Sequence, residues 1–380
     1  MEELTHRQRA LMSLSHQEAD RIPIDLGGRV SSMMQGIYTQ LKKRLNVITK
    51  NETVSSFQTI NDFDEEVLKR FDIDFRRIYF ERGPESIRLK ENFDGTYVNE
   101  WRITIKRVGP YIQRISHPLA EATIEDLKNY PWPDAYKGDR ASGLKEKARS
   151  LYETTDYAIF ADAVNGGIFE YAQHLRGMDR FFMDMVSNKD FAEALLDRVL
   201  EVLMGLFDVY LNAVGEYIQI ILYPDDYGMQ TGLLISPQLF REMIKPRLKK
   251  LIDFIKGKTK AKIMLHSDGS IYKIINDLIE IGIDILNPCQ PYAKDMEPEK
   301  LKEEFGDKVV FHGAIDQHKI LQEGTVEEVK KEVHRKIKGL ASGGGYILAP
   351  AHNIEEDTPV ENLIAMYDSA KGYGWYPIRC

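Results

Sequence analysis

The stretch KIMLHSDG, residues 262–269, decides the fold, because a short strand-like run is followed at once by polar side chains and a glycine. Similar runs lie at 157–162, 217–223, 262–265, 283–287, 309–311 and 345–348, with helix-like stretches at 188–213, 237–256, 270–282, 325–340 and 358–371. Apolar strands that alternate with helices are typical of parallel sheets covered on both faces. Six such units predict an α/β fold of the (β/α)8 TIM-barrel type. An open, doubly wound sheet ranks second, because we find no glycine-rich nucleotide fingerprint.

The first 150 residues are less regular, and we expect them to hold the first two barrel strands. Helical patterns cover residues 5–17 and 62–71, and a short strand-like run covers 74–80. Alternating apolar residues between 95 and 115 predict one or two antiparallel hairpins. We therefore predict one barrel domain over 1–380, with a helical and hairpin elaboration in 1–150 and regular β/α units over 151–380.

Composition narrows the class of protein. The 51 basic and 59 acidic residues give a net charge of −8, which argues against binding to the phosphate backbone of nucleic acids. We find neither a secretory signal nor an apolar run long enough to span a membrane. The two cysteines, Cys289 and Cys380, exclude a disulfide framework. The cytoplasm is the expected compartment.

Polar side chains follow each predicted strand of the regular part. The carboxyl ends of parallel barrel strands form one rim, where the active sites of barrel enzymes lie. We therefore expect these side chains at one rim: Asp162, Asp226, His266 with Asp268, Asn287 with Gln290, His312 and His352.

Each of these residues also has a simpler structural interpretation. Asp226 and Asp268 can act as turn residues that bond nearby main-chain amides. Asn287 can be an extended residue before Pro288. For His312 we favour a buried, hydrogen-bonded core histidine, and Cys289 can be a small buried apolar residue.

Three of the rim residues form a potential metal site. His266 and Asp268 are two residues apart, a spacing that suits a turn around one ion, and His352 would arrive from the last strand. Two histidines and a carboxylate can hold zinc with an open fourth position. The same groups can instead perform acid–base chemistry without a metal.

Several segments together resemble the uroporphyrinogen decarboxylase superfamily, which also contains corrinoid-dependent methyltransferases. They are RIPI at 21–24, DYGMQ at 226–230 with SPQLF at 236–240 and KP at 245–246, HSDG at 266–269, FHGAID at 311–316, GGGYILAPAHNI at 343–354 and TPVEN at 358–362. The resemblance implies the barrel that the strand pattern also predicts.

Within that superfamily, the decarboxylases carry an arginine-rich motif after the entry segment, which suits a substrate with eight carboxylates. The corresponding segment here is DLGGRVSS, residues 25–32, in which Arg29 is the one arginine and Asp25 has the opposite charge. The resemblance places Asp74 at the decarboxylases' central aspartate and His352 at their late histidine. This decarboxylase interpretation needs no cofactor.

The methyltransferase branch holds zinc with a his-x-cys pair and a later cysteine. His266 matches the family histidine, whereas Asp268 and His352 stand where the two cysteines would be. All three remain legitimate ligands. We find no cobalamin-binding motif in the chain, so the resemblance implies that cobalamin is supplied by a partner corrinoid protein.

The sequence therefore predicts a methyltransferase that moves a methyl group between a small-molecule substrate and a corrinoid protein. His266, Asp268 and His352 are the expected metal or catalytic residues, and Arg29, Asp162, Asp226, Asn287 and Gln290 the expected substrate-binding residues. The alternative is a uroporphyrinogen decarboxylase of haem synthesis that uses Asp74, and a third hypothesis is an inactive binding subunit. The sequence leaves the oligomeric state open, with a homodimer as the candidate.

Overall fold

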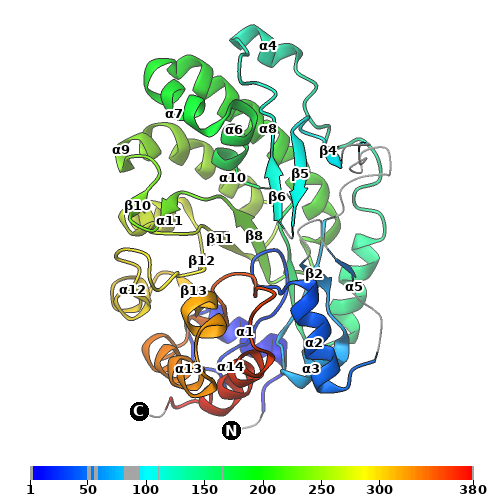
Figure 1. Cartoon of the computed structure of the whole chain (residues 1–380), viewed down its shortest axis with the longest axis vertical. Helices are drawn as coiled ribbons and strands as arrows, with labels where there is room; N and C mark the ends of the chain where they lie inside the picture. The colour runs from blue at the N-terminus through cyan, green and yellow to red at the C-terminus, as the bar shows by residue number, and fades with distance from the viewer. Residues whose placement is uncertain are drawn as a thin grey trace.

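A parallel sheet curled into a barrel forms the centre of the molecule. The computed structural model describes residues 3–48, 53–54, 59–80, 92, 95–109, 111–164 and 166–378. The described residues contribute seven neighbouring strands, in the order β14-β13-β12-β11-β8-β7-β3 (Figure 1). These are β14 (Tyr346–Pro350), β13 (Val310–Ile315), β12 (Ile285–Asn287), β11 (Lys262–His266), β8 (Ile220–Pro224), β7 (Ala158–Ala161) and β3 (Phe75–Ile78).

The gap between β14 and β3 is closed by the segment around Ile24. Ile24 forms a parallel bridge with Leu348 of β14, and its carbonyl oxygen accepts a hydrogen bond of 3.0 Å from the amide of Asp74, just before β3. Both this segment and β3 come from the N-terminal third of the chain. The predicted barrel, with its first two strands in that third, is confirmed.

Helices cover the outside of the barrel between successive strands. They are α6 (Ile168–Arg176), α7 (Met178–Ser187), α8 (Lys189–Val214), α9 (Pro237–Leu239), α10 (Lys245–Lys256), α11 (Ile275–Ile281), α12 (Pro298–Phe305), α13 (Val326–Leu340) and α14 (Val360–Tyr373). A π-helical turn at 240–244 joins α9 to α10. None of the described helices combines the length and the apolar character that crossing a membrane requires.

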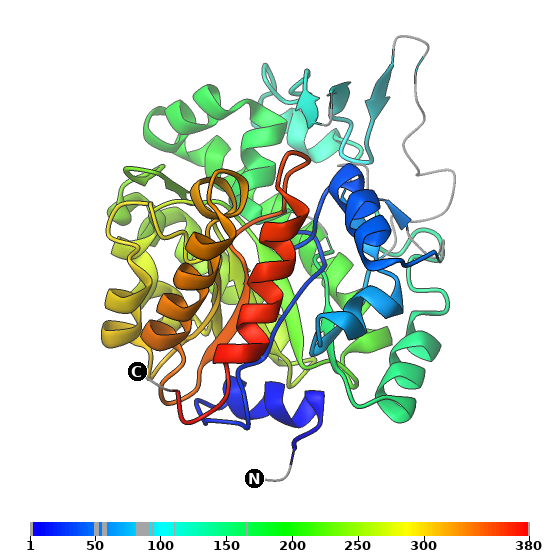
Figure 2. The same ribbon diagram turned by 60° about the horizontal axis from the view of Figure 1, so that its bottom comes forward.

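The N-terminal third adds structure at both ends of the barrel. The helix α1 (His6–Leu14), which is shorter than the predicted 5–17, lies across the amino ends of the strands (Figure 2). The antiparallel sheet of β4 (Thr96–Val98), β5 (Thr104–Val108) and β6 (Tyr111–Arg114) lies at the opposite end. It confirms the predicted hairpins. Smaller elements complete this part: α2 (Gln35–Leu45), β1 (Thr53–Val54), β2 (Ile60–Asp62), α3 (Glu65–Arg70), α4 (Ile124–Asn129) and α5 (Leu144–Thr154).

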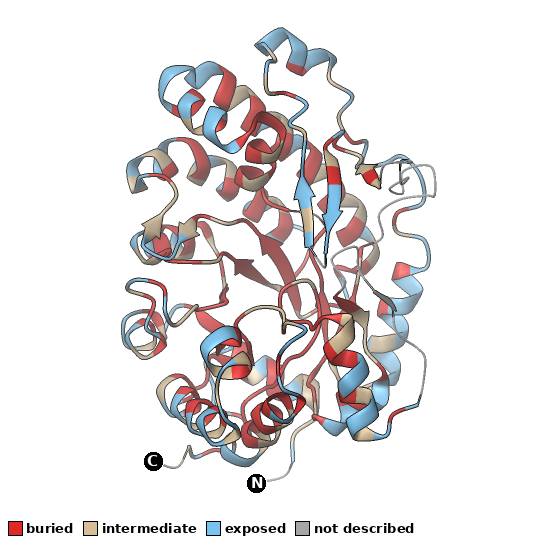
Figure 3. Ribbon diagram, in the orientation of Figure 1, coloured by how far each residue is buried: buried red, intermediate tan, exposed pale blue. Residues whose placement is uncertain are grey.

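The barrel interior changes from apolar to polar along its axis. Figure 3 shows the central strands as buried. One core cluster joins Ala10 and Leu14 of α1 to inward-facing strand residues, among them Phe75, Phe160, Leu222, Met264, Ile285, Val310 and Ile347. Nearer the carboxyl ends of the strands, the buried side chains include Arg77, Asp25, His312, Asn287 and His266. The polar layer therefore lies beneath the barrel mouth, which we define as the end at the carboxyl ends of the strands.

Asp74 holds the other end of the barrel together. Its fully buried carboxylate accepts hydrogen bonds from Arg9 (2.6 Å), Arg21 (2.7 Å) and the amide of Ile24 (2.7 Å), and His6 Nδ1 lies 2.8 Å from Oδ1. Burial raises the pKa of Asp74, but the effects of Arg21, His6 and Arg9 outweigh it and bring the pKa down to about 2.

This position corrects the expectation that Asp74 is a catalytic residue. Asp74 precedes β3, so it lies at the amino end of the strand, whereas the rim groups lie at the carboxyl ends. The groups that donate to Asp74 come from α1 and from the closing segment. Asp74 is therefore a structural ion-pair centre that joins these two elements to β3.

Replacing Asp74 with asparagine removes the buried counter-charge that Arg9 and Arg21 share, leaving Arg9 with Asp20 and Arg21 with the more exposed Asp72. We expect D74N to lower the free energy of unfolding by about 3–5 kcal/mol, as measured by urea denaturation. The control D72N removes the partly exposed carboxylate that also pairs with Arg21 and is expected to cost less than about 1 kcal/mol. Equal effects of D74N and D72N would contradict this assignment.

The same carboxylate predicts a pH dependence. Because the pKa of Asp74 is lower in the folded chain than its ordinary value of 3.8, its stabilising contribution is present above pH 4. That contribution is lost as the pH falls from about 4 to about 2. Wild-type stability is therefore expected to fall more steeply than that of D74N over this range.

Candidate active site

The structure brings His266, Asp268 and His352 together at the barrel mouth. His266 ends β11, Asp268 follows two residues later, and His352 follows β14. The Nε2 atoms of His266 and His352 lie 3.8 and 3.9 Å from Asp268 Oδ2. One potential ligand atom from each residue lies within 4.8 Å of the other two. We call this set the rim triad.

A chain of hydrogen bonds runs from His266 across the barrel interior. His266 Nδ1 lies 2.5 Å from Asn287 Oδ1, and Asn287 Nδ2 lies 2.8 Å from His312 Nδ1. His312 Nε2 lies 2.8 Å from Asp25 Oδ2, and the guanidinium of Arg77 donates to the same oxygen. We call this the interior chain.

The interior chain sets which nitrogen of His266 faces the mouth. Asn287 Nδ2 also lies 3.4 Å from the carbonyl oxygen of His312, an atom that can only accept, so the amide nitrogen faces His312 and the amide oxygen faces His266. His266 Nδ1 must then carry the hydrogen that this oxygen accepts. In a neutral ring, the lone pair is left on Nε2, toward Asp268.

His312 is the buried, hydrogen-bonded core histidine that we favoured from the sequence. Its ring is completely buried, and burial lowers its pKa although Asp25 opposes the shift. In the neutral ring, Nδ1 accepts from Asn287 and Nε2 donates to Asp25. His312 therefore links the Asp25 carboxylate to the amide that orients His266.

The rim triad has the chemistry of a divalent-metal site. Burial lowers the pKa of His352 below its ordinary value, while the Asp268 carboxylate opposes the shift. Two neutral imidazoles and one carboxylate form a ligand set that suits zinc and leaves a position open. The hydrogen bond to the far nitrogen of His266 is the outer support that metal-bound histidines usually have. The residues present therefore fit a metal.

The loop that carries Asp268 is held by two other predicted residues. Asp226 Oδ1 accepts a 2.8 Å hydrogen bond from the amide of Asp268, and Gln290 Oε1 accepts one of 2.9 Å from the amide of Gly269. Gly269 has φ +76°, and a side chain there would meet main-chain atoms of Met229 at 2.7 Å. Asp226 and Gln290 thus shape this turn, and Asp226 also lines the adjoining cavity.

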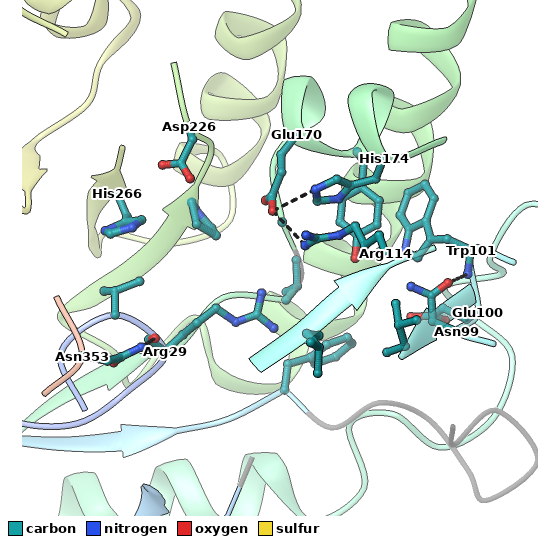
Figure 4. Close-up of a pocket in the computed structure, with 18 of the residues that line it drawn as sticks. Arg29, Asn99, Glu100, Trp101, Arg114, Glu170, His174, Asp226, His266 and Asn353 are labelled. Carbon is teal, nitrogen blue, oxygen red and sulfur yellow. Dashed lines mark hydrogen bonds and ion pairs between the residues drawn. The ribbon is translucent and has the colours of Figure 1, made fainter. Parts of the chain in front are cut away.

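A cavity of about 270 Å³ opens beside the rim triad. On the barrel side it is lined by Arg29, Asp226, His266, His352 and Asn353, and Figure 4 shows Arg29 extending into it. The Arg29 main chain is fixed at both its polar groups, since its amide donates to Asp162 (2.8 Å) and its carbonyl accepts from Asn353 (2.9 Å).

The residues of the opposite wall of the cavity were not among the predicted site residues. It comes from β5, β6, α6 and the turn before β5, and includes Trp101, Ile105, Ile112, Arg114, Glu170, Tyr171 and His174. Arg114 and His174 lie 3.4 and 3.5 Å from Glu170 Oε1 (Figure 4). Burial raises the pKa of Glu170 and lowers that of His174 to about 2. No local motif marks these residues, because the wall forms only when the hairpin of β5 and β6 packs over the barrel mouth, far from it in sequence.

The remaining expected residues have structural contacts. Asn287 is buried within the interior chain and does not line the cavity. Asp162 is buried, and its oxygens accept from the amides of Arg29 and Ala163. Cys289 is buried, and burial raises the pKa of its thiol to about 12. Asp162 and Asn287 therefore position other groups instead of facing the cavity.

Comparison with known proteins gives one family and a fold neighbour. The family model for uroporphyrinogen decarboxylase (URO-D) matches residues 105–373, more than half of the chain. The structure superimposes on a methyltransferase from Methanosarcina mazei with a TM-score of 0.65 at 19% identity, covering 98% of this chain and 99% of that one. At that identity, the likeness concerns the fold alone.

Curated relatives divide between two activities. A methylcobamide:CoM methyltransferase of Methanosarcina barkeri is 25% identical over 205 residues, 53% of this chain and 55% of that protein. A chloroplastic uroporphyrinogen decarboxylase of Oryza sativa subsp. japonica is 24% identical over 180 residues, 45% of this chain and 43% of that protein. The match thus spans about half the length of each relative.

The interior chain predicts an effect on metal binding from a residue that cannot touch the metal. We expect N287L to weaken zinc binding by about 10- to 100-fold, because His266 Nδ1 loses its acceptor. N287D keeps an acceptor for His266 Nδ1 and should restore part of the affinity, although its second oxygen replaces the donor that faces His312. Zinc affinity is measured by competition with a chelating dye, and a thermal melt checks the fold. Wild-type affinity in a folded N287L would contradict the role of the interior chain.

Proposed function

We propose that this chain, which belongs to the uroporphyrinogen decarboxylase (URO-D) family, transfers a methyl group between a small substrate and the corrinoid of a separate protein. The observation that carries this proposal is the rim triad: three side chains from β11, the turn after it and the end of β14 meet at the barrel mouth. The methyltransferase relatives support it at the level of the family.

The three triad side chains would hold the metal through His266 Nε2, a carboxylate oxygen of Asp268 and a ring nitrogen of His352. A bound divalent ion supplies a Lewis acid at the substrate heteroatom, whether a methoxy or amine donor or a thiol acceptor. On loss of its methyl group, the donor's heteroatom would keep the electron pair of the broken bond and take up a proton, while the new bond to carbon would use an electron pair of the corrinoid.

Other residues of the chain orient the proposed metal ligands. Asn287 and His312 hold the His266 ring, and Asp226 holds the Asp268 amide. The side chains of His352 and Asp268 are 34% and 38% exposed. These two side chains are therefore reachable from outside the barrel, which supports a partner protein that presents its cofactor at the mouth.

The cavity does not favour the decarboxylase alternative. A porphyrinogen with eight carboxylates calls for many free cations, yet two of the three arginines that line the cavity are paired with lining glutamates, Arg114 with Glu170 and Arg140 with Glu100. Asp74, the residue expected to serve that reaction, lies at the other end of the barrel. A small substrate suits this cavity better.

Metal analysis tests the first part of the proposal. After loading with zinc and removal of the excess, the wild type is expected to hold about one ion per chain, and H266A almost none. H318A is a matched control, because His318 is exposed and lies outside the rim triad. The absence of zinc from wild type, or equal zinc in wild type and H266A, would contradict the site.

Turnover tests the second part. With cob(I)alamin in place of the partner, a panel of methoxy and methylamine donors is expected to yield methylcobalamin, followed by its absorbance. The reverse reaction uses methylcobalamin and thiol acceptors. H266A should lower the rate by at least about 100-fold while H318A does not. Conversion of uroporphyrinogen to coproporphyrinogen would establish the decarboxylase alternative, and inactivity in both assays would favour a binding subunit.

A further inference from the structure

Arg29 is the one cavity-lining arginine whose guanidinium contacts no acceptor among the described residues. Arg114 lies 3.4 Å from Glu170, and Arg140 lies 2.6 Å from Glu100. The Arg29 contacts, by contrast, involve only its main chain, with Asp162 and Asn353. A partly buried guanidinium is a planar donor group that pairs best with a carboxylate. The cavity therefore offers a bound molecule one guanidinium whose donors have no hydrogen-bond acceptor among the described residues, although its charge is felt by Glu170.

Part of the far wall of the cavity is apolar, beside the paired Arg114 and Glu170. Trp101 is 1% exposed and stacks on Tyr171 with ring centroids 4.1 Å apart, and the ring of Trp132 lies nearly perpendicular to it at 6.3 Å. Phe80, Ile105 and Ile112 line the same cavity. Such a wall favours an apolar body over a second charged group.

The cation lies between the rim triad and this wall. In Figure 4, His266 and Asp226 lie at one end of the cavity and Trp101 at the other, with the Arg29 side chain reaching between them. A molecule with its reacting group at the triad can thus place an anionic group on Arg29 and an apolar body on the wall. With a volume of about 270 Å³, the cavity suits a small molecule.

We infer that the substrate is a small monocarboxylate with an apolar, ring-sized body, bound through Arg29 and the wall of Trp101, Ile105 and Ile112. This inference deepens the proposed function and rests on it, since the methyl-bearing or methyl-accepting group would lie at the rim triad. A dianion or polyanion leaves charge without a partner, because the other lining arginines are already paired.

Binding of simple probes tests this inference without chemistry. Isothermal titration of the wild-type protein with benzoate should give saturable binding of one molecule per chain. Benzamide, which has nearly the same shape without the charge, should bind about 10- to 100-fold more weakly. Acetate, which lacks the apolar body, and mellitate, which carries six carboxylates, should show no saturable binding.

Two variants assign the contacts. R29A should weaken benzoate binding by about 10- to 100-fold, whereas R198A, which removes an exposed arginine of α8, should leave it unchanged. I112A shortens the apolar wall and should weaken benzoate binding severalfold. A thermal melt confirms that each variant is folded. Equal binding of benzoate and benzamide by wild type, or undiminished benzoate binding by R29A, would overturn the inference.

The titration separates this inference from the proposed function. Methyl transfer that depends on His266, combined with no benzoate binding, would refute the monocarboxylate site and leave the methyltransferase proposal standing. Binding of benzoate that depends on Arg29, without methyl transfer to any donor or acceptor tested, would support the carboxylate site and count against the proposed reaction.

Discussion

The interior chain of hydrogen bonds is the constraint on which the mouth of this barrel depends. Polar groups inside a closed barrel have no water to bond, so each needs a protein partner. Arg77, His312, Asn287 and His266, from four strands, and Asp25, from the closing segment, are linked in one row of hydrogen bonds. Asp25 Oδ1 and the Nε and Nη1 atoms of Arg77 are buried without a hydrogen-bond partner among the described residues. The register of those strands therefore fixes the ring of His266 and the nitrogen that it presents. The packing of the barrel interior therefore determines how His266 is oriented in the candidate metal site.

The two ends of the barrel use buried charge differently. At the amino end, Asp74 is surrounded by donors from α1 and from the closing segment, which it joins to β3. At the mouth, the rim triad brings together three potential metal ligands, and Arg29 has no acceptor for its guanidinium among the described residues. Stability and the proposed chemistry are thus separated along the barrel axis. The hairpins add an apolar wall that the barrel strands alone do not provide.

Much of this arrangement follows from local sequence, and the rest depends on distant contacts. The strand pattern predicted the barrel, and the rule that polar residues after parallel strands meet at one rim predicted that His266, Asp268 and His352 converge. The same rule does not distinguish Asn287, which turns inward to His312, from His266, which faces the mouth. Asp74 was assigned wrongly because it precedes its strand and so lies at the amino end. Trp101 and Arg114 were missed, because only tertiary packing brings the hairpins to the cavity.

The central claim is that the rim triad holds one divalent metal ion, and anomalous diffraction from a zinc-loaded crystal tests it most directly. The account predicts a single strong peak within about 2.0–2.2 Å of His266 Nε2, an Asp268 oxygen and a ring nitrogen of His352, with the Asn287 amide still bonded to His266 Nδ1. A peak at other residues, or no peak at the mouth in a crystal whose protein has been loaded with zinc, would contradict it.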